Sequence, residues 1–243
     1  MDQPFVERKY LFFTYARVIL NDELLAWLVR DCAYSYIVGV SHNQFDLGHQ
    51  VSIRQKKTIM IRLDMSIEKI FQKFNDTARN EVRRTERMSD LVFTCNDGNW
   101  NEIYTMYKAH RKERGLPIHS LKFLQWGMQF SAYWQGRLIS TITCYNAKPC
   151  LRIQNIFSRI AADDKELRRI TGYASRRLVY EICKFGSQNG YTLLDMASAN
   201  VADPAKAGIT QFKSSFGGTI ADEYIYTYKG AIPRLFGKLK FKA

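Results

Sequence analysis

The strongest constraint on the fold of this chain is a run of three stretches in which apolar and polar residues alternate with a period of two. The stretches cover residues 130–135, 138–145 and 150–160. Connections of two and four residues join them, and connections this short make antiparallel neighbours. The run therefore predicts an antiparallel meander in the second half of the chain.

A helix and a further strand are predicted directly after the meander. Leu178, Ile182 and Phe185 recur at helical spacing, and Gly186 and Gly190 end the pattern. Residues 191–197 are nearly all apolar, which is typical of a buried strand. The predicted fold class is α+β or α/β, with a mixed, mostly antiparallel central sheet flanked by helices. Further strands are expected within residues 10–20, 34–40, 51–63, 91–95 and 219–228.

Residues 66–88 predict one continuous amphipathic helix capped by Ser66. Arg79, Arg83 and Arg87 are spaced by four and stack on its polar side, with Arg84 beside them. This stripe is either a solvated basic face or an anion-binding face, and the sequence leaves both open. Arg79, Arg83 and Arg84 are therefore candidate substrate-binding residues.

The net charge of +13 favours an anionic partner, such as a phosphate-bearing cofactor, a nucleic acid or an acidic membrane surface. The chain has no apolar run as long as a membrane span, and its first residues are too polar for a signal peptide. A cytoplasmic location is expected. Residues 229–243 carry five basic residues and no acidic one. This basic amphipathic tail either contacts an anionic membrane peripherally or packs on the domain.

A phosphate-bearing ligand is predicted at the start of the helix that follows the meander. Small residues at a helix start let backbone N–H groups approach an anion, and the helix dipole adds to the attraction. Two arginines supply further positive charge. The predicted binding residues are Arg168, Arg169, Ile170, Thr171, Gly172, Tyr173 and Ala174.

No metal site is expected from the sequence. The four histidines, at positions 42, 49, 110 and 119, show no metal-ligand spacing and are expected at the surface. The five cysteines form no CxxC pair, so a zinc site is not indicated.

The order of elements resembles the GNAT acyltransferase fold. In that superfamily a turn of the pattern [Gln/Arg]-x-x-Gly-x-[Gly/Ala] begins the helix after the fourth strand, and Arg169, Gly172 and Ala174 match it. Residues 74–87 resemble the arginine-rich helix of the FemAB-like branch. Residues 191–195 and 208–218 resemble the closing segment of that branch, a strand ending in Asp followed by Gly-x-x-x-Phe-Lys-x-x-Phe-Gly. These marks cover residues 58–228.

The resemblance implies transfer of an acyl group from acyl-CoA to an amine on a sugar, a lipid or a cell-envelope precursor. The backbone of the matching turn would hold the pyrophosphate of acyl-CoA. FemAB-like enzymes take aminoacyl groups from charged tRNA and carry two tandem domains. This chain has room for residues 64–228 as one such domain, with residues 1–63 as an N-terminal extension packed on it. Because the turn is also intact, acyl-CoA is the expected donor and aminoacyl-tRNA the alternative.

Several residues receive roles on this hypothesis. Backbone N–H groups within residues 150–160 would polarise the donor carbonyl. Asp195 would bind or deprotonate the amine, or else cap the next segment. Tyr226 would protonate the leaving thiolate, or else serve in packing, and Lys213 either contacts an anionic substrate or is exposed. A rival of another class is a non-catalytic domain that binds nucleic acid through the arginine stripe.

Overall fold

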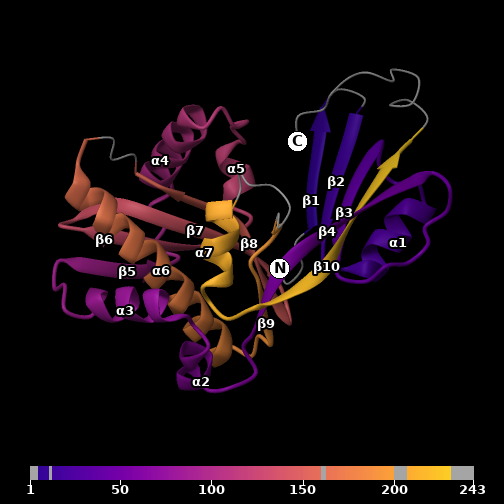
Figure 1. Cartoon of the computed structure of the whole chain (residues 1–243). Coiled ribbons are helices and arrows are strands. Elements are labelled where there is room, and N and C mark those ends of the chain that lie inside the picture. Colours follow the sequence, from indigo (N-terminus) through magenta and orange to yellow (C-terminus); the bar gives the residue numbers. More distant parts are fainter. Residues whose placement is uncertain (1–4, 11–12, 160–162, 200–206, 231–243) are drawn as a thin grey trace.

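The computed structural model of the chain describes residues 5–10, 13–159, 163–199 and 207–230 (Figure 1). The strands are β1 (Phe5–Tyr10), β2 (Phe13–Ile19), β3 (Tyr36–Ser41), β4 (Val51–Arg62), β5 (Leu91–Cys95), β6 (Met128–Trp134), β7 (Arg137–Ala147), β8 (Cys150–Ser158), β9 (Leu193–Asp195) and β10 (Thr219–Lys229). The helices are α1 (Asp22–Arg30), α2 (Ile67–Gln72), α3 (Asp76–Thr85), α4 (Trp100–Glu113), α5 (Leu121–Leu124), α6 (Lys165–Gln188) and α7 (Ala207–Ser214). Within these ranges, no helix is long and apolar enough to cross a membrane. Of the predicted tail at 229–243, residues 231–243 lie outside the described residues.

The strands form one sheet in the order β1-β2-β3-β10-β4-β9-β8-β7-β6-β5. Strands β6, β7 and β8 are antiparallel neighbours, as the period of two predicted. Strand β9 runs parallel to β8, and α6 makes the connection between them. The predicted mixed, mostly antiparallel sheet flanked by helices is confirmed.

The first 63 residues contribute four strands to this same sheet. Strands β1 and β2 form an antiparallel pair where one strand over 10–20 was predicted. Strand β2 is parallel to β3 through the crossover helix α1, and β4 pairs with both β10 and β9. The predicted division at residue 63 therefore falls directly after a strand in the middle of the sheet. The division into domains stays a prediction.

The predicted continuous helix over 66–88 is wrong, because it breaks at Asn75. Helix α2 ends at Gln72, and the side chain of Asn75 accepts a hydrogen bond of 2.9 Å from the backbone N–H of Ala78 to cap α3. The backbone N–H of Asn75 donates instead to the carbonyl of Ser215, at 2.8 Å. A side chain that caps a new helix competes with continuation of the old one. The predicted apolar face still holds, since Ile70, Phe74, Ala78 and Val82 are all buried.

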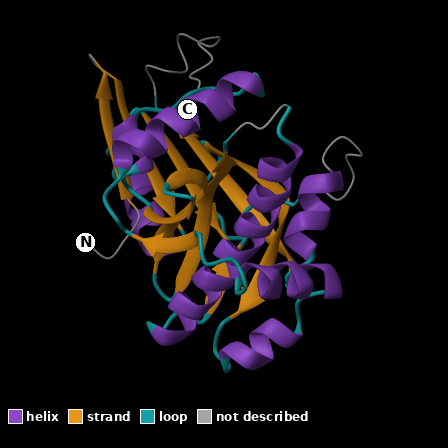
Figure 2. Cartoon of the chain, turned by 90° about the vertical axis from the view of Figure 1, so that its left-hand side faces the viewer, coloured by secondary structure: helices purple, strands orange, loops and turns teal. Residues whose placement is uncertain are grey.

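Helices α6 and α4 cover opposite faces of the sheet (Figure 1). Figure 2 shows the helices and strands of the same structure after a turn of 90°. Successive side chains on a strand point to opposite faces. On β8, Ile156 packs against the core cluster that contains Leu178 of α6, whereas Phe157 belongs to the cluster that contains Tyr107 of α4. Helix α3 packs beside α6. Residues of α4, α6 and β8 line one pocket.

Candidate functional site

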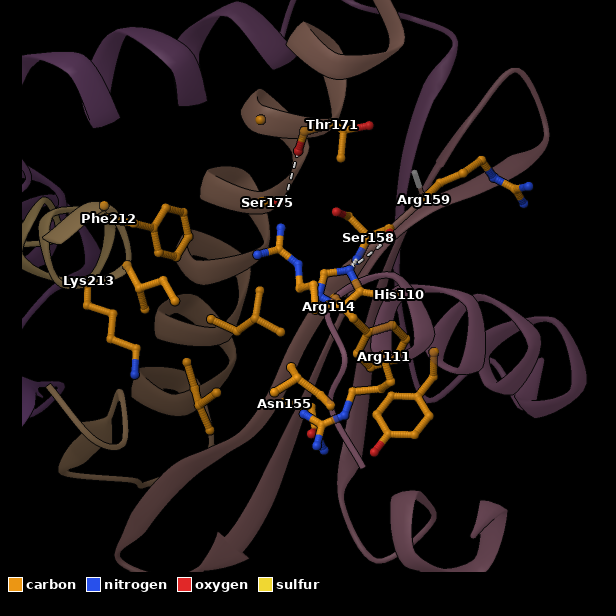
Figure 3. A pocket seen from close by; sticks show the side chains of 18 of the residues that line it. His110, Arg111, Arg114, Asn155, Ser158, Arg159, Thr171, Ser175, Phe212 and Lys213 are labelled. Carbon is orange, nitrogen blue, oxygen red and sulfur yellow. Dashed lines mark hydrogen bonds between the residues drawn. The ribbon is translucent and has the colours of Figure 1, made fainter. Parts of the chain in front are cut away.

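The central feature of the site is an edge of β8 that loses its partner strand. Strand β9 pairs only with Cys150, Leu151 and Arg152, although β8 continues to Ser158 along β7 on its other side. Among the described residues, no strand pairs with the β9-facing edge of β8 beyond Arg152. A pocket of about 780 Å³ lies along this edge, between α4, α6 and α7 (Figure 3). Backbone groups at a free strand edge can bind a ligand, because they have no ladder partner.

A β-bulge interrupts the regular pairing of β8 with β7 beside the pocket. Cys144 of β7 faces Ile153, and Thr143 faces Asn155, so Gln154 is an extra residue on β8. The side-chain amide of Gln154 donates to the carbonyl of Phe123 at 2.8 Å, and its Oε1 is buried with no hydrogen-bond partner in the described part of the chain. Bulges are over-represented beside active sites, where they redirect side chains.

The pocket lining is strongly cationic. It contains five arginines and one lysine against a single acidic residue, Glu113. Arg159 pairs with Glu102 at 3.3 Å, and Arg176 pairs with Glu81 at 2.8 Å. The lining cations are Arg111, Arg114, Arg159, Arg168, Arg176 and Lys213. Such a lining favours an anionic ligand, and guanidinium groups match the geometry of phosphate oxygens.

Helix α6 begins earlier than the sequence predicted. Its first residue is Lys165, and Asp164 caps it by accepting a hydrogen bond of 2.8 Å from the N–H of Leu167. From Arg168 onward the backbone N–H groups bond within the helix. The prediction that residues 168–174 open the helix is therefore wrong, and their N–H groups are not available to an anion. Asp164 and Glu166 also place negative charge at the helix start, where it disfavours phosphate.

Three of the seven predicted binding residues still line the pocket, through the side of the helix. They are Arg168, Thr171 and Gly172, and Ser175 and Arg176 continue the same face. The hydroxyl oxygen of Thr171 is buried, and in the described structure it has no hydrogen-bond partner. Figure 3 shows the side chains of Thr171 and Ser175 at the wall of the pocket.

The other four residues of the predicted set have different positions. Ile170 and Ala174 are buried in the core under α6. Tyr173 receives a hydrogen bond of 2.8 Å from Arg84, and Arg169 lies 3.9 Å from Glu166. None of these four lines the pocket.

Lys213 is a buried cation at the pocket wall, so the alternative that it is exposed is not met. Its Nζ donates to the carbonyl oxygens of Ala197 and Ser198, at 2.8 and 2.9 Å. Burial lowers the pKa of Lys213 to about 8, although nearby Asp195 acts in the opposite direction. A buried amine whose pKa lies near the working pH is a common feature of functional sites.

Asp195 ends β9 as predicted, but its surroundings do not suit a proton acceptor. Its carboxylate accepts hydrogen bonds from Arg152, Thr58, His42 at 2.8 Å and the N–H of Ala197 at 2.8 Å. Burial alone would raise its pKa, but the charge of Arg152 and the hydrogen bond from His42 hold that pKa well below the usual range. The carboxylate thus stays ionised, and its oxygens already accept hydrogen bonds within the protein. Both facts argue against its predicted role as a base.

Arg152 also pairs with Glu223, which is fully buried on β10. The three side chains Asp195, Arg152 and Glu223 form a buried charge network that connects β9, β8 and β10. Ala197 and Lys213 link this network to the pocket wall. These three side chains do not line the pocket. They support the pocket wall from behind.

Tyr226 lies away from the pocket, in the core of the N-terminal half of the sheet. Its hydroxyl accepts from the N–H of Phe45 at 2.8 Å and donates to the carbonyl of Asn43 at 3.0 Å. The ring stacks on Phe45, and burial raises the pKa of the hydroxyl. The packing alternative fits this residue, and protonation of a leaving group does not.

The arginine stripe also lies outside the pocket lining. Arg79 pairs with Asp76 and donates to the carbonyl of Gln72 at 2.7 Å, and Arg83 lies over the ring of Phe71 at 5.6 Å. Arg84 stacks on Tyr173 of α6 at 5.5 Å from the ring centre. These contacts join α2, α3 and α6, so the predicted substrate-binding role of the stripe has no support from the pocket geometry.

Sequence reasoning missed the pocket residues of α4. His110, expected at the surface, lines the pocket with Arg111 and Arg114, and its Nδ1 lies 3.3 Å from the carbonyl oxygen of Ser158. Burial and the charge of Arg114 lower the pKa of His110. The cluster of basic residues at the C-terminal end of the helix over 100–113 was the sequence signal that could have indicated these pocket residues. Among the described residues, no cluster of His, Cys, Asp and Glu could hold a metal ion.

Neither protein-family models nor curated proteins match this sequence. Solved structures match in fold. FemX aligns with a TM-score of 0.66 at 10% identity, covering 95% of this chain and 85% of FemX. The chain has a FemAB-like GNAT fold. The resemblance predicted from the sequence motifs is confirmed at the level of the fold.

Two further solved structures are similar to this chain in fold. L-PGS from Bacillus licheniformis aligns with a TM-score of 0.58 at 14% identity, covering 95% of this chain and 82% of that one. A conserved protein of unknown function from Bacteroides thetaiotaomicron aligns with a TM-score of 0.54 at 10% identity, covering 94% of this chain and 84% of that one. The alignment covers 85% of the FemX chain, so this chain matches more than one half of FemX.

Proposed function

We propose that this protein transfers an acyl group from a phosphate-bearing donor to an amine. The observation that carries the proposal is the free edge of β8, which lies inside a pocket lined by six cations and one acid. Backbone N–H groups on that edge would donate to the donor carbonyl as it becomes an oxyanion. The cations of the lining would bind the phosphate groups of the donor.

The reaction is an acyl substitution. The amine nitrogen attacks the carbonyl carbon, a C–N bond forms, and the bond to the leaving sulfur or oxygen breaks. The proton lost by the amine ends on that leaving atom, so the products are an amide and a thiol or alcohol. Lys213 of α7 contributes a cation at the pocket wall, where it contacts the segment that follows β9. A fixed positive charge there would stabilise negative charge that develops on the donor.

We propose acyl-CoA as the donor and an amine on a sugar, lipid or cell-envelope precursor as the acceptor. In place of the backbone turn, the side chains of Arg168, Thr171 and Arg176 would hold the phosphates from the flank of α6. Thr171 supports this assignment, since its buried hydroxyl has no partner among the described residues and borders the pocket. A buried hydroxyl without a partner is unfavourable unless a ligand satisfies it.

Aminoacyl-tRNA is the second candidate donor. The capped and acidic start of α6 provides no backbone cradle for a diphosphate, which weakens the specific case for CoA. The resemblance to the FemAB-like branch implies aminoacyl transfer, and the fold is shared with FemX over most of both chains. The reaction at the free edge of β8 would be the same, with an ester in place of the thioester.

Thr171→Val is expected to weaken donor binding by roughly tenfold or more without destabilising the fold. Valine has nearly the shape of threonine, and removal of a buried hydroxyl without a partner is neutral or stabilising, whereas a hydrogen bond to a charged phosphate contributes about 1.5–3 kcal/mol. Calorimetric titration with CoA, acetyl-CoA and an amide-linked aminoacyl-RNA measures the binding. Thermal unfolding of the free protein measures the stability.

The pattern across ligands separates the donors. Acyl-CoA binding that weakens in Thr171→Val supports the CoA proposal, and binding of only the aminoacyl-RNA supports the second candidate. Thr105→Val is a matched control, because Thr105 lies outside this pocket and its hydroxyl bonds to the carbonyl of Asn101. Absence of binding by every acyl donor would overturn the proposed function.

A further inference from the structure

Three exposed apolar side chains lie on, or within two residues of, positions that line the pocket. Leu116, Ile118 and Ile209 are 41%, 48% and 54% exposed. Leu116 and Ile209 both line the pocket, one from the segment after α4 and the other from α7, and Ile118 follows Leu116 by two residues. We call these three residues the apolar rim. A cluster of exposed aliphatic groups at one opening marks an interaction surface more than single exposed residues do.

The segment that carries Leu116 and Ile118 is held in place by hydrogen bonds. The backbone N–H of Leu116 donates to the carbonyl of Arg111 at 2.9 Å, and the guanidinium of Arg111 donates to the carbonyl of Pro117 at 2.8 Å. The apolar side chains thus project from a fixed turn. Residues 112–118 are all exposed. A fixed, exposed apolar turn has little ordering entropy left to lose when a partner covers it.

Positive charge directly precedes the turn that carries Leu116 and Ile118. Lys108, Arg111, Lys112 and Arg114 occupy the last part of α4 and the residue after it, with Glu113 as the acidic exception. Lys108, Lys112 and Arg114 are exposed. Such a surface combines aliphatic groups that can enter an apolar layer with cations that can reach phosphates around it.

We propose that the apolar rim docks the pocket mouth on an anionic lipid bilayer. Leu116, Ile118 and Ile209 would enter the headgroup region, and the cations at the end of α4 would contact lipid phosphates. The exposed apolar residues at the mouth are aliphatic. A nucleic-acid partner would call for aromatic side chains that stack on bases, so the bilayer fits better.

The proposal needs neither the tail beyond residue 230 nor the transfer reaction. It predicts that the protein binds vesicles of phosphatidylcholine mixed with phosphatidylglycerol and does not bind vesicles of phosphatidylcholine alone. Leu116→Ser combined with Ile118→Ser should weaken binding to the anionic vesicles at least tenfold in a flotation assay. Lys112→Glu should weaken it several-fold, and added salt should reduce the remainder.

Two matched controls define the expected specificity. Val92→Ser combined with Ile220→Ser removes apolar side chains that are 53% and 55% exposed on β5 and β10, outside the pocket lining. Lys69→Glu reverses an exposed charge on α2. Both controls should bind vesicles as the wild type does, and thermal unfolding should show that all four variants are folded.

Several results would overturn the proposal. It fails if the full chain does not float with anionic vesicles, or if the rim variant floats as well as the wild type. It also fails if the protein binds single-stranded RNA through the same residues and ignores vesicles. Acyl-donor binding measured separately distinguishes this outcome from failure of the proposed function, because the vesicle assay contains no donor.

Discussion

Arg152→Met is expected to lower the free energy of unfolding by about 3–5 kcal/mol, because it removes the guanidinium that pairs with two buried carboxylates. Asp195 and Glu223 are both fully buried, and each pairs with the Arg152 guanidinium. Without that partner Asp195 would keep its hydrogen bonds from Thr58, His42 and the N–H of Ala197 but lose its buried ion pair, as would Glu223. Denaturation by urea, followed by circular dichroism, measures the change.

The pH dependence gives an independent check of this network. The folded-state pKa of Asp195 is lowered, so its stabilising contribution is present above the ordinary aspartate range and is lost as the pH falls. The wild type and Arg152→Met should therefore differ less in stability at low pH than at neutral pH. Arg62→Met, at an exposed pair with Asp64, is the matched control and should change the stability little, because water screens this pair. An Arg152→Met variant as stable as the control would contradict the account.

Lys213→Met is expected to lower the rate of acyl transfer roughly a hundredfold, the effect of removing one preorganised group that stabilises charge in the transition state. Lys213 is 8% exposed at the pocket wall, and methionine preserves much of its length and apolar packing. If the protonated amine is the active form, wild-type activity should fall as the pH rises through about 8, the pKa that burial gives this lysine. A variant with wild-type activity would exclude Lys213 from the reaction.

The same substitution should also change how the free energy of unfolding depends on pH, and this can be measured without a substrate. Between about 8 and 10.5 the unfolded chain holds a proton on Lys213 that the folded chain has released. The free energy of unfolding should therefore rise with pH across this window, by up to about 3 kcal/mol. In Lys213→Met the rise should be reduced by that amount. Lys122→Met, on α5, is a control that should leave both the activity and this rise unchanged.

The fold was predictable where side-chain periodicity fixes both the element and its neighbours. The meander β6–β7–β8 and the crossover α6 follow from alternating and helical patterns in continuous stretches of sequence. The start of α6 was predicted late because Arg168 and Arg169 resemble an anion-binding turn. The cap is set by Asp164, four residues upstream of Arg168.

The candidate site was less predictable, because its chemistry depends on contacts between distant segments. Asp195 was placed correctly at the end of a strand, but Arg152, Thr58 and His42 lie 43, 137 and 153 residues away from it in the chain. No local sequence pattern shows that these three side chains meet at Asp195 and donate hydrogen bonds to its carboxylate. Lys213 emerged from the Phe-Lys motif, whereas its burial against Ala197 and Ser198 required the folded structure.

The most direct test is a crystal structure of the protein with a CoA derivative whose thioester is replaced by a ketone, and with an amide-linked aminoacyl-RNA. The account predicts that one of these donors lies in the pocket, with its carbonyl oxygen at hydrogen-bond distance from a backbone N–H of β8 between Ile153 and Ser158. Its phosphates should contact Arg168 or Arg176. A donor bound away from the free edge of β8, with this pocket empty, would contradict it.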